Sequence, residues 1–325
     1  LLNESLKRKR LTEEEKIRLL GKVKTVSSLE KISSSDLVIE AVFEDLNLKH
    51  NLYKKIEPHL KESAILASNT STLPITKLAE VLADSTRFIG IHFFSPVDKM
   101  NLVELIKSER TNDTALAVAL DYTSLIKKTP IVVNDSRGFY ANRCIIPYIN
   151  EGLRMLSEGI EPALVENAAK QIGMPVGPLQ LLDELSVSLA LNVAKETKEA
   201  LGTKYEETGT ESILLEMSQK NRLGRKELAG FYEYDEKGRR LKLWEGLRNL
   251  NIEKNSADIS TVTVKNRLAY VQALEAARAL EENILLSVEE GDVGGILGWG
   301  CLIWAGGPFS WLAVSYTHLT LPTKA

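Results

Sequence analysis

The residue pair best suited to chemistry in this sequence is His92 with Glu104. His92 ends an apolar run that begins after Arg87, and Glu104 lies near the start of a second apolar run, residues 102–106. The segment between the two runs is too short for the helical crossover that parallel neighbours need, so the second strand is expected to return antiparallel. A carboxylate beside an imidazole fixes one tautomer of the ring and stabilises its protonated form, which suits the histidine for proton transfer.

A single His–Glu pair has a simpler explanation, a structural histidine beside a solvated glutamate. Three apolar runs in β-α-β-α-β order are, however, each followed at once by polar residues, at 40–44, 68–72 and 92–95. Turn formation or helix capping could explain one such cluster, but three at corresponding strand ends favour a shared site. Ligands of parallel sheets bind beyond the carboxyl ends of the strands, so the sequence predicts a site at this edge.

The periodicity predicts an α/β unit followed by an all-helical part. Strands are expected at 36–42, 64–67, 87–92, 102–106 and 131–133, with a further short strand at 23–26, and helices at 47–60, 74–82 and 114–126. Residues 1–20 predict an exposed helix or two short ones, because charges of both signs surround a few apolar positions. From residue 134 the pattern becomes helical, with helices expected over 145–156 and 162–171.

The helical part contains an internal repeat. Asn142, Arg143, Glu151, Arg154, Leu156, Glu158 and Ile160 recur 124 positions later as Asn266, Arg267, Glu275, Arg278, Leu280, Glu282 and Ile284. Gly177-Pro178 and Leu182 recur 130 positions later as Gly307-Pro308 and Leu312. We interpret this as a duplicated helical module, joined by the charged segment 235–255.

The composition excludes several classes of protein. A net charge of −3 gives no indication of nucleic-acid binding. Cys144 and Cys301 lie in apolar helical contexts and are expected to be buried thiols, and no Cys/His/Asp cluster has the spacing of a metal site. The uncharged stretch 293–311 is interrupted by glycines and a proline, which fits a buried helix and loop better than a membrane span. No secretory signal is visible.

Three motifs together resemble the 3-hydroxyacyl-CoA dehydrogenases. They are Ala-Ser-Asn-Thr-Ser-Thr at 67–72, His-Phe-Phe-Ser-Pro at 92–96 with a Glu twelve residues after the His, and Gly-Phe-Tyr-Ala-Asn-Arg at 138–143. The resemblance extends from about residue 1 to Leu312. The repeated module is similar, more narrowly, to the dehydrogenase part of the bifunctional β-oxidation enzyme, in which an enoyl-CoA hydratase precedes this unit.

The resemblance implies an incomplete Rossmann-like NAD-binding domain followed by duplicated all-α C-terminal domains. The expected boundaries are 1–133 for the partial NAD-binding domain, 134–234 and 257–313 for the helical domains, and 235–256 for a linker. Residues 314–325 break the preceding pattern and are expected to be a non-native tail. The residues before Asp36 contain only Gly21, so the Gly-rich turn that holds the pyrophosphate of NAD is missing from the sequence. The chain alone is therefore expected to bind NAD weakly or not at all.

The resemblance also assigns roles to residues. His92 would take the proton of the substrate's 3-hydroxyl, Glu104 would orient His92, Ser71 would hydrogen-bond the reacting oxygen, and Asn142 would hold His92 or the thioester. The nicotinamide-ribose half of NAD would lie among Ala41, Glu44, Lys49, Ser71, Ser95 and Lys226. Ser95 replaces the asparagine that most members of the family have.

The activity implied is oxidation of (S)-3-hydroxyacyl-CoA with NAD⁺ in fatty-acid β-oxidation. The expected partners are an acyl-CoA substrate, a thiolase subunit and a second copy in a homodimer, with no nucleic acid and no integral membrane segment, and the expected location is cytoplasmic. Two alternatives stay open: a non-catalytic binding or assembly module of a multifunctional β-oxidation enzyme, and a related dehydrogenase that acts on a small hydroxy acid without CoA.

Overall fold

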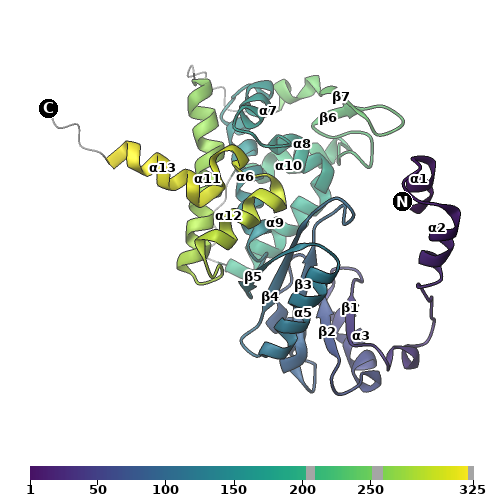
Figure 1. Ribbon diagram of the computed structural model, residues 1–325. Helices are drawn as coiled ribbons and strands as arrows, with labels where there is room; N and C mark the ends of the chain where they lie inside the picture. Colours follow the sequence, from purple (N-terminus) through teal and green to yellow (C-terminus); the bar gives the residue numbers. More distant parts are fainter. Residues whose placement is uncertain (203–208, 251–258, 321–325) are drawn as a thin grey trace.

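The central element of the fold is a five-stranded sheet, shown in the computed structural model of Figure 1, which describes residues 1–202, 209–250 and 259–320. The strand order is β1-β2-β3-β4-β5, and only β3 and β4 are antiparallel neighbours, as the short connection between them predicted. The strands are β1 (Leu37–Glu40), β2 (Ile65–Ser68), β3 (Phe88–Phe93), β4 (Leu102–Lys107) and β5 (Thr129–Asn134). The predicted strand at 23–26 is wrong: Val23 and Val26 are exposed and pair with no described strand.

The two faces of the sheet belong to different cores. Ile89, Ile91, Val103 and Leu105 point to one face and pack with α5 (Asp113–Leu125). Alternate residues such as Phe88 and Ile106 point to the other face and join a core that continues into the helical domains. Also on the sheet side are α3 (Leu46–Ile56), η2 (Glu57–His59), α4 (Ile75–Ala79) and η3 (Ser85–Arg87). The sheet is therefore one continuous structural unit with the helices that follow it.

The first 26 residues form an arm beside the rest of the molecule (Figure 1). The arm contains α1 (Leu2–Lys7) and α2 (Glu13–Leu20), and neither helix has a buried residue. Thr12 and Glu15 form a reciprocal capping box at the start of α2, which stabilises the helix locally without tertiary packing. The 3-10 turn η1 (Leu29–Ile32) then leads to β1.

The helical part is built around two long helices, α6 (Ala141–Ser157) and α11 (Thr261–Glu281), which pack against each other. The first group of helices continues with α7 (Pro162–Gln171), α8 (Pro178–Leu185), α9 (Val187–Leu201) and α10 (Thr210–Gln219). The second group continues with α12 (Val288–Trp299), η6 (Ile303–Ala305) and α13 (Pro308–Thr320). Cys144 and Cys301 are buried, as predicted.

Crosswise ion pairs join the two long helices. Arg143 of α6 donates from Nε to Glu275 at 2.6 Å and from Nη1 to Glu282 at 2.5 Å. In the reverse direction Arg267 of α11 donates from Nε to Glu151 at 2.5 Å and from Nη2 to Glu158 at 2.9 Å. Both arginines are less than a quarter exposed, so these contacts are screened less than surface pairs.

A second feature also occurs in both groups of helices. Glu166 on α7 accepts a hydrogen bond from the Leu179 N–H at the start of α8 (2.8 Å), and Asp292 on α12 accepts one from the Phe309 N–H at the start of α13 (2.7 Å). Each carboxylate thereby caps the next helix, which begins with Gly-Pro. A Cβ on Gly177 or Gly307 would lie 2.3 or 2.5 Å from the capping oxygen, so glycine is required at both turns.

Among the residues that the structure describes, a two-stranded hairpin follows the first group of helices and not the second. It consists of β6 (Tyr232–Tyr234) and β7 (Arg240–Leu243), followed by η5 (Glu245–Asn249). Asp183 holds it in place by accepting from the N–H groups of Phe231 (2.8 Å) and Tyr232 (2.9 Å). Residues 240–250, expected within a linker, thus pack on the first helical domain. Residues 251–256 of that linker lie outside the described residues, as do 321–325 of the expected tail, while 314–320 continue α13.

Candidate active site

The predicted His–Glu pair forms across two antiparallel strands. His92 on β3 lies directly opposite Glu104 on β4 in the strand register, so their side chains project from the same face. The Nδ1 atom of His92 lies 2.7 Å from Oε2 of Glu104. Both residues are buried, with exposed fractions of 5% for His92 and 0% for Glu104. A buried carboxylate at this distance sets the tautomer with hydrogen on Nδ1, which leaves the Nε2 lone pair available.

The second oxygen of Glu104 caps a helix of the other domain. Its Oε1 accepts from the backbone N–H groups of Ala141 (2.9 Å) and Tyr140 (3.2 Å) at the start of α6. The chain reaches this position through Gly138 and Phe139, which both have positive φ angles (75° and 52°). These two N–H groups have no acceptor within α6, and Glu104 supplies it. One buried carboxylate therefore joins the histidine, the sheet and the helical domain.

Two aromatic rings flank the imidazole. The ring of Phe94 lies 4.7 Å from that of His92 between centroids, and the ring of Phe139 lies 6.0 Å away. His92 Nε2 has no hydrogen-bond partner among the described residues. The ring is thus held by packing on its faces and by a carboxylate on one nitrogen, while its other nitrogen can accept a proton.

The turn after β2 is fixed from three directions. Asn142, the second residue of α6, donates from Nδ2 to the backbone oxygen of Ser71 at 2.7 Å. Asn69 accepts from the Phe93 N–H at 2.9 Å, which joins this turn to the end of β3. Glu44 accepts from the Ser71 N–H at 2.9 Å. The predicted convergence of three strand ends is confirmed by these contacts.

A buried ionic network next to the same turn helps to hold it in place. Lys49, 1% exposed, lies 2.8 Å from Glu40 and 3.4 Å from Glu44 through its Nζ atom. Glu40 also accepts from the hydroxyls of Tyr53 (2.6 Å) and Ser68 (2.8 Å). Burial acts to raise the pKa of Glu40, but the hydrogen bond from Lys49 and those from the hydroxyls outweigh it and hold the pKa below its usual value. Burial and the turn contacts act on Glu44 in the same way, with the same net lowering of its pKa.

The residues predicted to contact the cofactor occupy different positions relative to His92. Ala41 and Ser95 are exposed just beyond the ends of β1 and β3, and Ser71 is exposed on the turn between them. Lys49 is buried beneath this edge rather than at its surface. Lys226 is exposed in the turn that leads to the hairpin, and among the described residues it has no hydrogen bond or ion pair to the residues around His92.

Sequence reasoning missed several contributors. The N–H groups of Tyr140 and Ala141 carry no side-chain signal, and only the start of a helix after Gly138 could have indicated them. Asn69 belongs to the predicted polar cluster at 68–72, but the sequence indicated no separate contact for it. In the described part of the chain, no three acidic, histidine or cysteine side chains are grouped to hold a metal ion. The helices described there are too short or too polar to cross a membrane.

Comparisons with known proteins agree with this geometry. Residues 1–136 match the family described as the NAD binding domain of 3-hydroxyacyl-CoA dehydrogenase, and residues 138–234 match its C-terminal domain. The fatty acid oxidation complex subunit alpha of Shewanella loihica is 36% identical over all 325 residues. The chain spans about half the length of that curated relative, 46%.

Solved structures show the same relationship. The (S)-3-hydroxybutyryl-CoA dehydrogenase of Ralstonia eutropha is 37% identical, with a TM-score of 0.67 over 72% of this chain and 83% of its own. The dehydrogenase part of multifunctional enzyme 1 from C. elegans is 27% identical, with a TM-score of 0.64 over 100% of this chain and 76% of its own. The match to the second structure includes the second group of helices.

Proposed function

The chain belongs to the 3-hydroxyacyl-CoA dehydrogenase family, and from that premise we propose that the protein oxidises (S)-3-hydroxyacyl-CoA to 3-ketoacyl-CoA with NAD⁺ in fatty-acid β-oxidation. The observation that carries the proposal is the buried His92–Glu104 pair with a free Nε2 atom at the edge where three strands end. A sheet edge with these polar ends is where a dinucleotide and its substrate meet in this class of fold.

In the proposed reaction His92 acts as the base. Its Nε2 atom accepts the proton of the substrate's 3-hydroxyl group while the hydrogen on the same carbon leaves as hydride, and the C–O single bond becomes a carbonyl. NAD⁺, when bound, supplies the hydride acceptor. The imidazolium that forms is stabilised by Glu104 at 2.7 Å, and two N–H groups at the start of α6 hold the other oxygen of Glu104 in place. General-base catalysis of this kind contributes about 10²–10⁴-fold to the rate.

Ser71 and Asn142 complete the catalytic set in this proposal. Negative charge develops on the substrate oxygen as its proton leaves, so a preplaced donor lowers the barrier. The exposed hydroxyl of Ser71 is assigned this role, and Asn142 holds the backbone of Ser71 in position at 2.7 Å. Asn142 is therefore assigned to act on the Ser71 turn, in addition to the expectation that it would hold His92 or the thioester.

The strand ends fit the nicotinamide-ribose half of NAD. The exposed residues at these strand ends are small or hydroxylated, namely Ala41, Ser71 and Ser95. Glu44 holds the Ser71 turn in place by accepting from the Ser71 N–H. Lys49 is assigned to hold Glu40 and Glu44 rather than to contact the ribose. Lys226 stays a proposal for the cofactor face. Residues 1–36 contain a single glycine, Gly21, and no residue of this chain is assigned to the pyrophosphate half.

We further propose that the two groups of helices are a duplication. The crosswise arginine pairs and the two acid-capped Gly-Pro turns support it, because each contact has a counterpart 124 to 130 positions away. The remaining assignments are that the protein works in the cytoplasm, that a thiolase is a partner subunit, and that two copies form a dimer. The thiolase assignment is supported by the relative from Shewanella loihica, which is a subunit of a fatty acid oxidation complex.

The proposal is tested by NADH oxidation with acetoacetyl-CoA, the reverse reaction, in the full-length protein. His92→Gln should lower kcat by about 10²–10⁴-fold. His59→Gln, which changes a histidine outside the site, is the matched control and should leave kcat unchanged. Full activity in His92→Gln, or no turnover in the wild-type protein, would contradict the proposal. Activity on 3-hydroxybutyrate that free CoA does not inhibit would instead favour a small hydroxy acid as substrate.

A further inference from the structure

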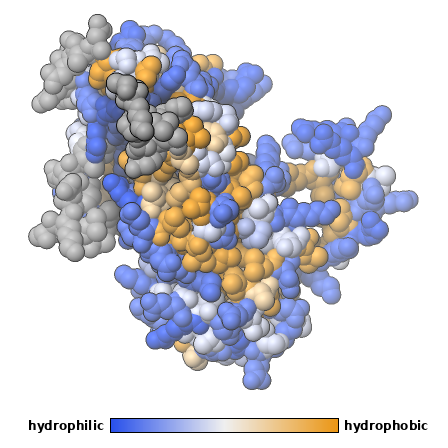
Figure 2. All heavy atoms as spheres, turned by 60° about the vertical axis from the view of Figure 1, so that its left-hand side comes forward, coloured by the Kyte–Doolittle hydropathy of each residue, from blue (hydrophilic) through white to orange (hydrophobic). Residues whose placement is uncertain are grey.

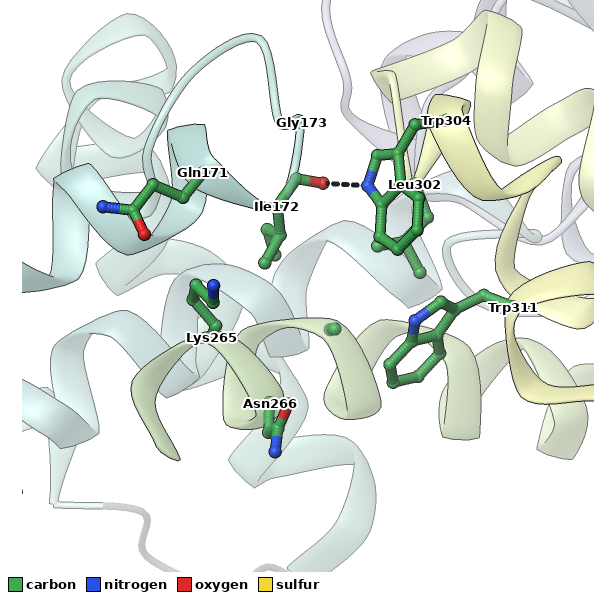
Figure 3. A pocket seen from close by; sticks show the side chains of 9 residues that line it. Gln171, Ile172, Gly173, Lys265, Asn266, Leu302, Trp304 and Trp311 are labelled. Atoms are coloured by element: carbon green, nitrogen blue, oxygen red, sulfur yellow. Dashed lines mark hydrogen bonds between the residues drawn. The ribbon is translucent and has the colours of Figure 1, made fainter. Parts of the chain in front are cut away.

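A pocket of about 460 Å³ lies between the two groups of helices, and none of the residues around His92 lines it. It is formed by the end of α7, the first half of α11, and the segment from Leu302 to α13 (Figure 3). Its volume is within the range of small-molecule sites. Asn266, the repeat counterpart of Asn142, lines it.

One wall of the pocket is an exposed indole in a fixed orientation. Trp304 donates from Nε1 to the backbone oxygen of Ile172 at 2.8 Å. Gly173, with φ +87°, makes room for the ring, since a Cβ there would lie 2.9 Å from Cδ1 of Trp304. The side chain is nevertheless 67% exposed. A large aromatic group that is held rigid yet left in solvent is typical of a binding surface.

A second indole and polar groups complete the pocket. Trp311 packs edge-on against Tyr270, with 4.6 Å between ring centroids. Figure 3 shows the two tryptophans at one end and Lys265 and Gln171 at the other. Lys265 has no carboxylate partner among the described residues, and no acidic residue lines the pocket. The face turned forward in Figure 2 carries a broad apolar area. Next to Trp304 in the chain, Ile303 is also exposed, at 53%.

We propose that this pocket binds an adenine nucleotide. The base stacks on the indoles, which accept any flat aromatic ring. The phosphate pairs with the Lys265 ammonium at the opposite end. The side-chain amides of Asn266 and Gln171, which have no partner among the described residues, can both donate to and accept from the base and ribose. This site is separate from the proposed cofactor site, so it goes beyond the proposed dehydrogenase function.

The test is calorimetric titration of the full chain with AMP, and separately with CoA, adenosine and inorganic phosphate. AMP or CoA should bind, and adenosine and phosphate should each bind more weakly than AMP, since each supplies half of the contacts. Tighter binding of CoA than of AMP would identify the nucleotide end of the coenzyme as the source. Tighter binding of AMP would identify a free nucleotide.

Two variants separate the stacking and charge contributions. Trp304→Ala should weaken AMP binding about tenfold or more, in line with the loss of one base–aromatic stack. Lys265→Gln should weaken it several-fold and reduce its dependence on salt. Lys237→Gln, at an exposed lysine on the hairpin, is the charge-matched control and should bind AMP like the wild type. Absence of AMP and CoA binding, or equal AMP binding by Trp304→Ala and the wild type, would overturn the proposal.

Discussion

The starts of α6 and α11 have the same repeat position but different surroundings. α6 begins at Ala141, one residue before Asn142, and its first N–H groups bind Glu104 of the sheet. α11 begins at Thr261, five residues before Asn266, and is capped by its own Ser260, whose Oγ accepts from the Thr263 N–H at 3.1 Å. The extra turn of α11 moves its helix end away from the position that corresponds to the catalytic centre.

This difference gives a reason why, under the proposed function, only the first group of helices contributes to the active site. Asparagine is present at both positions, but only at the start of α6 do two backbone N–H groups bind Glu104 while the asparagine amide binds the backbone oxygen of Ser71. A helix whose own N-cap side chain binds one of its first N–H groups has fewer of them to offer to an external carboxylate. In the proposed function, catalysis therefore depends on the contact of α6 with β4 and the β2 turn, and the proposed duplication alone would not supply it.

The largest expected effect comes from breaking the α6 contact at its acid. Glu104→Gln should lower kcat by about 10²–10⁴-fold. An amide that accepts from Ala141 with its oxygen presents its NH₂ to His92, which forces hydrogen onto Nε2 and removes the base. The measurement is kcat together with the unfolding midpoint in urea. Glu104→Ala is the companion variant, and it should lose both activity and stability because two buried N–H groups lose their acceptor. Equal activity of Glu104→Gln and the wild type would show that the tautomer is unimportant.

A smaller effect is expected at the hairpin, which occurs in only one of the two groups of helices. Burial raises the pKa of Asp183 from 3.8 to about 6, and the hydrogen bonds from Phe231 and Tyr232 offset only part of the rise. The folded protein therefore binds this proton more tightly than the unfolded chain, and the stabilisation is complete below pH 4 and lost as the pH rises to about 6. The contribution is about 3 kcal/mol at most.

The check is the free energy of unfolding of Asp183→Asn and the wild type from pH 4 to 7. The wild type should lose stability relative to the variant as the pH rises through this window. Burial also raises the pKa of Glu166. Glu166 is present in both proteins, so its contribution cancels from the difference in unfolding free energy. Parallel curves would contradict the assignment of the slope to Asp183.

Removing either crosswise arginine, Arg143 or Arg267, should lower the stability of the protein by a similar amount, but the two changes should differ in their effect on activity. Arg143→Ala and Arg267→Ala should each destabilise the protein by about 1–2 kcal/mol, as the loss of partly buried ion pairs predicts. Only Arg143→Ala should also lower kcat/KM, by several-fold, because Arg143 follows Asn142 on the helix that holds the Ser71 turn. Urea unfolding and steady-state kinetics measure the two effects. Equal kinetic losses in both variants would argue against an active site confined to one copy.

The smallest effect is expected at the cap of α11. Ser260→Ala should cost about 1 kcal/mol of stability, the usual value for an N-cap serine. It should leave kcat unchanged, since this helix end touches no residue around His92. Thermal unfolding with steady-state kinetics provides the comparison with Glu104→Ala, the corresponding loss of a cap at α6. A change in kcat for Ser260→Ala would show that the two helix ends are coupled.

The sequence predicted those features that depend on local pattern. The antiparallel return of β4 followed from the short connection, and the meeting of three polar strand ends followed from the strand order. The strand predicted at 23–26 failed because its valines have no neighbouring strand to pair with among the described residues. The capping of α6 by Glu104 could not be predicted, because backbone N–H groups are the same at every residue and only the tertiary fold selects which ones lie near a carboxylate.

The most direct measurement is the tautomer of His92, read from the ¹⁵N chemical shifts of its imidazole at a pH where the ring is neutral. Hydrogen on Nδ1 in the wild type and on Nε2 in Glu104→Gln is the predicted result, since Glu104 lies 2.7 Å from Nδ1. A neutral His92 with hydrogen on Nε2 in the wild-type protein would contradict its assignment as the base.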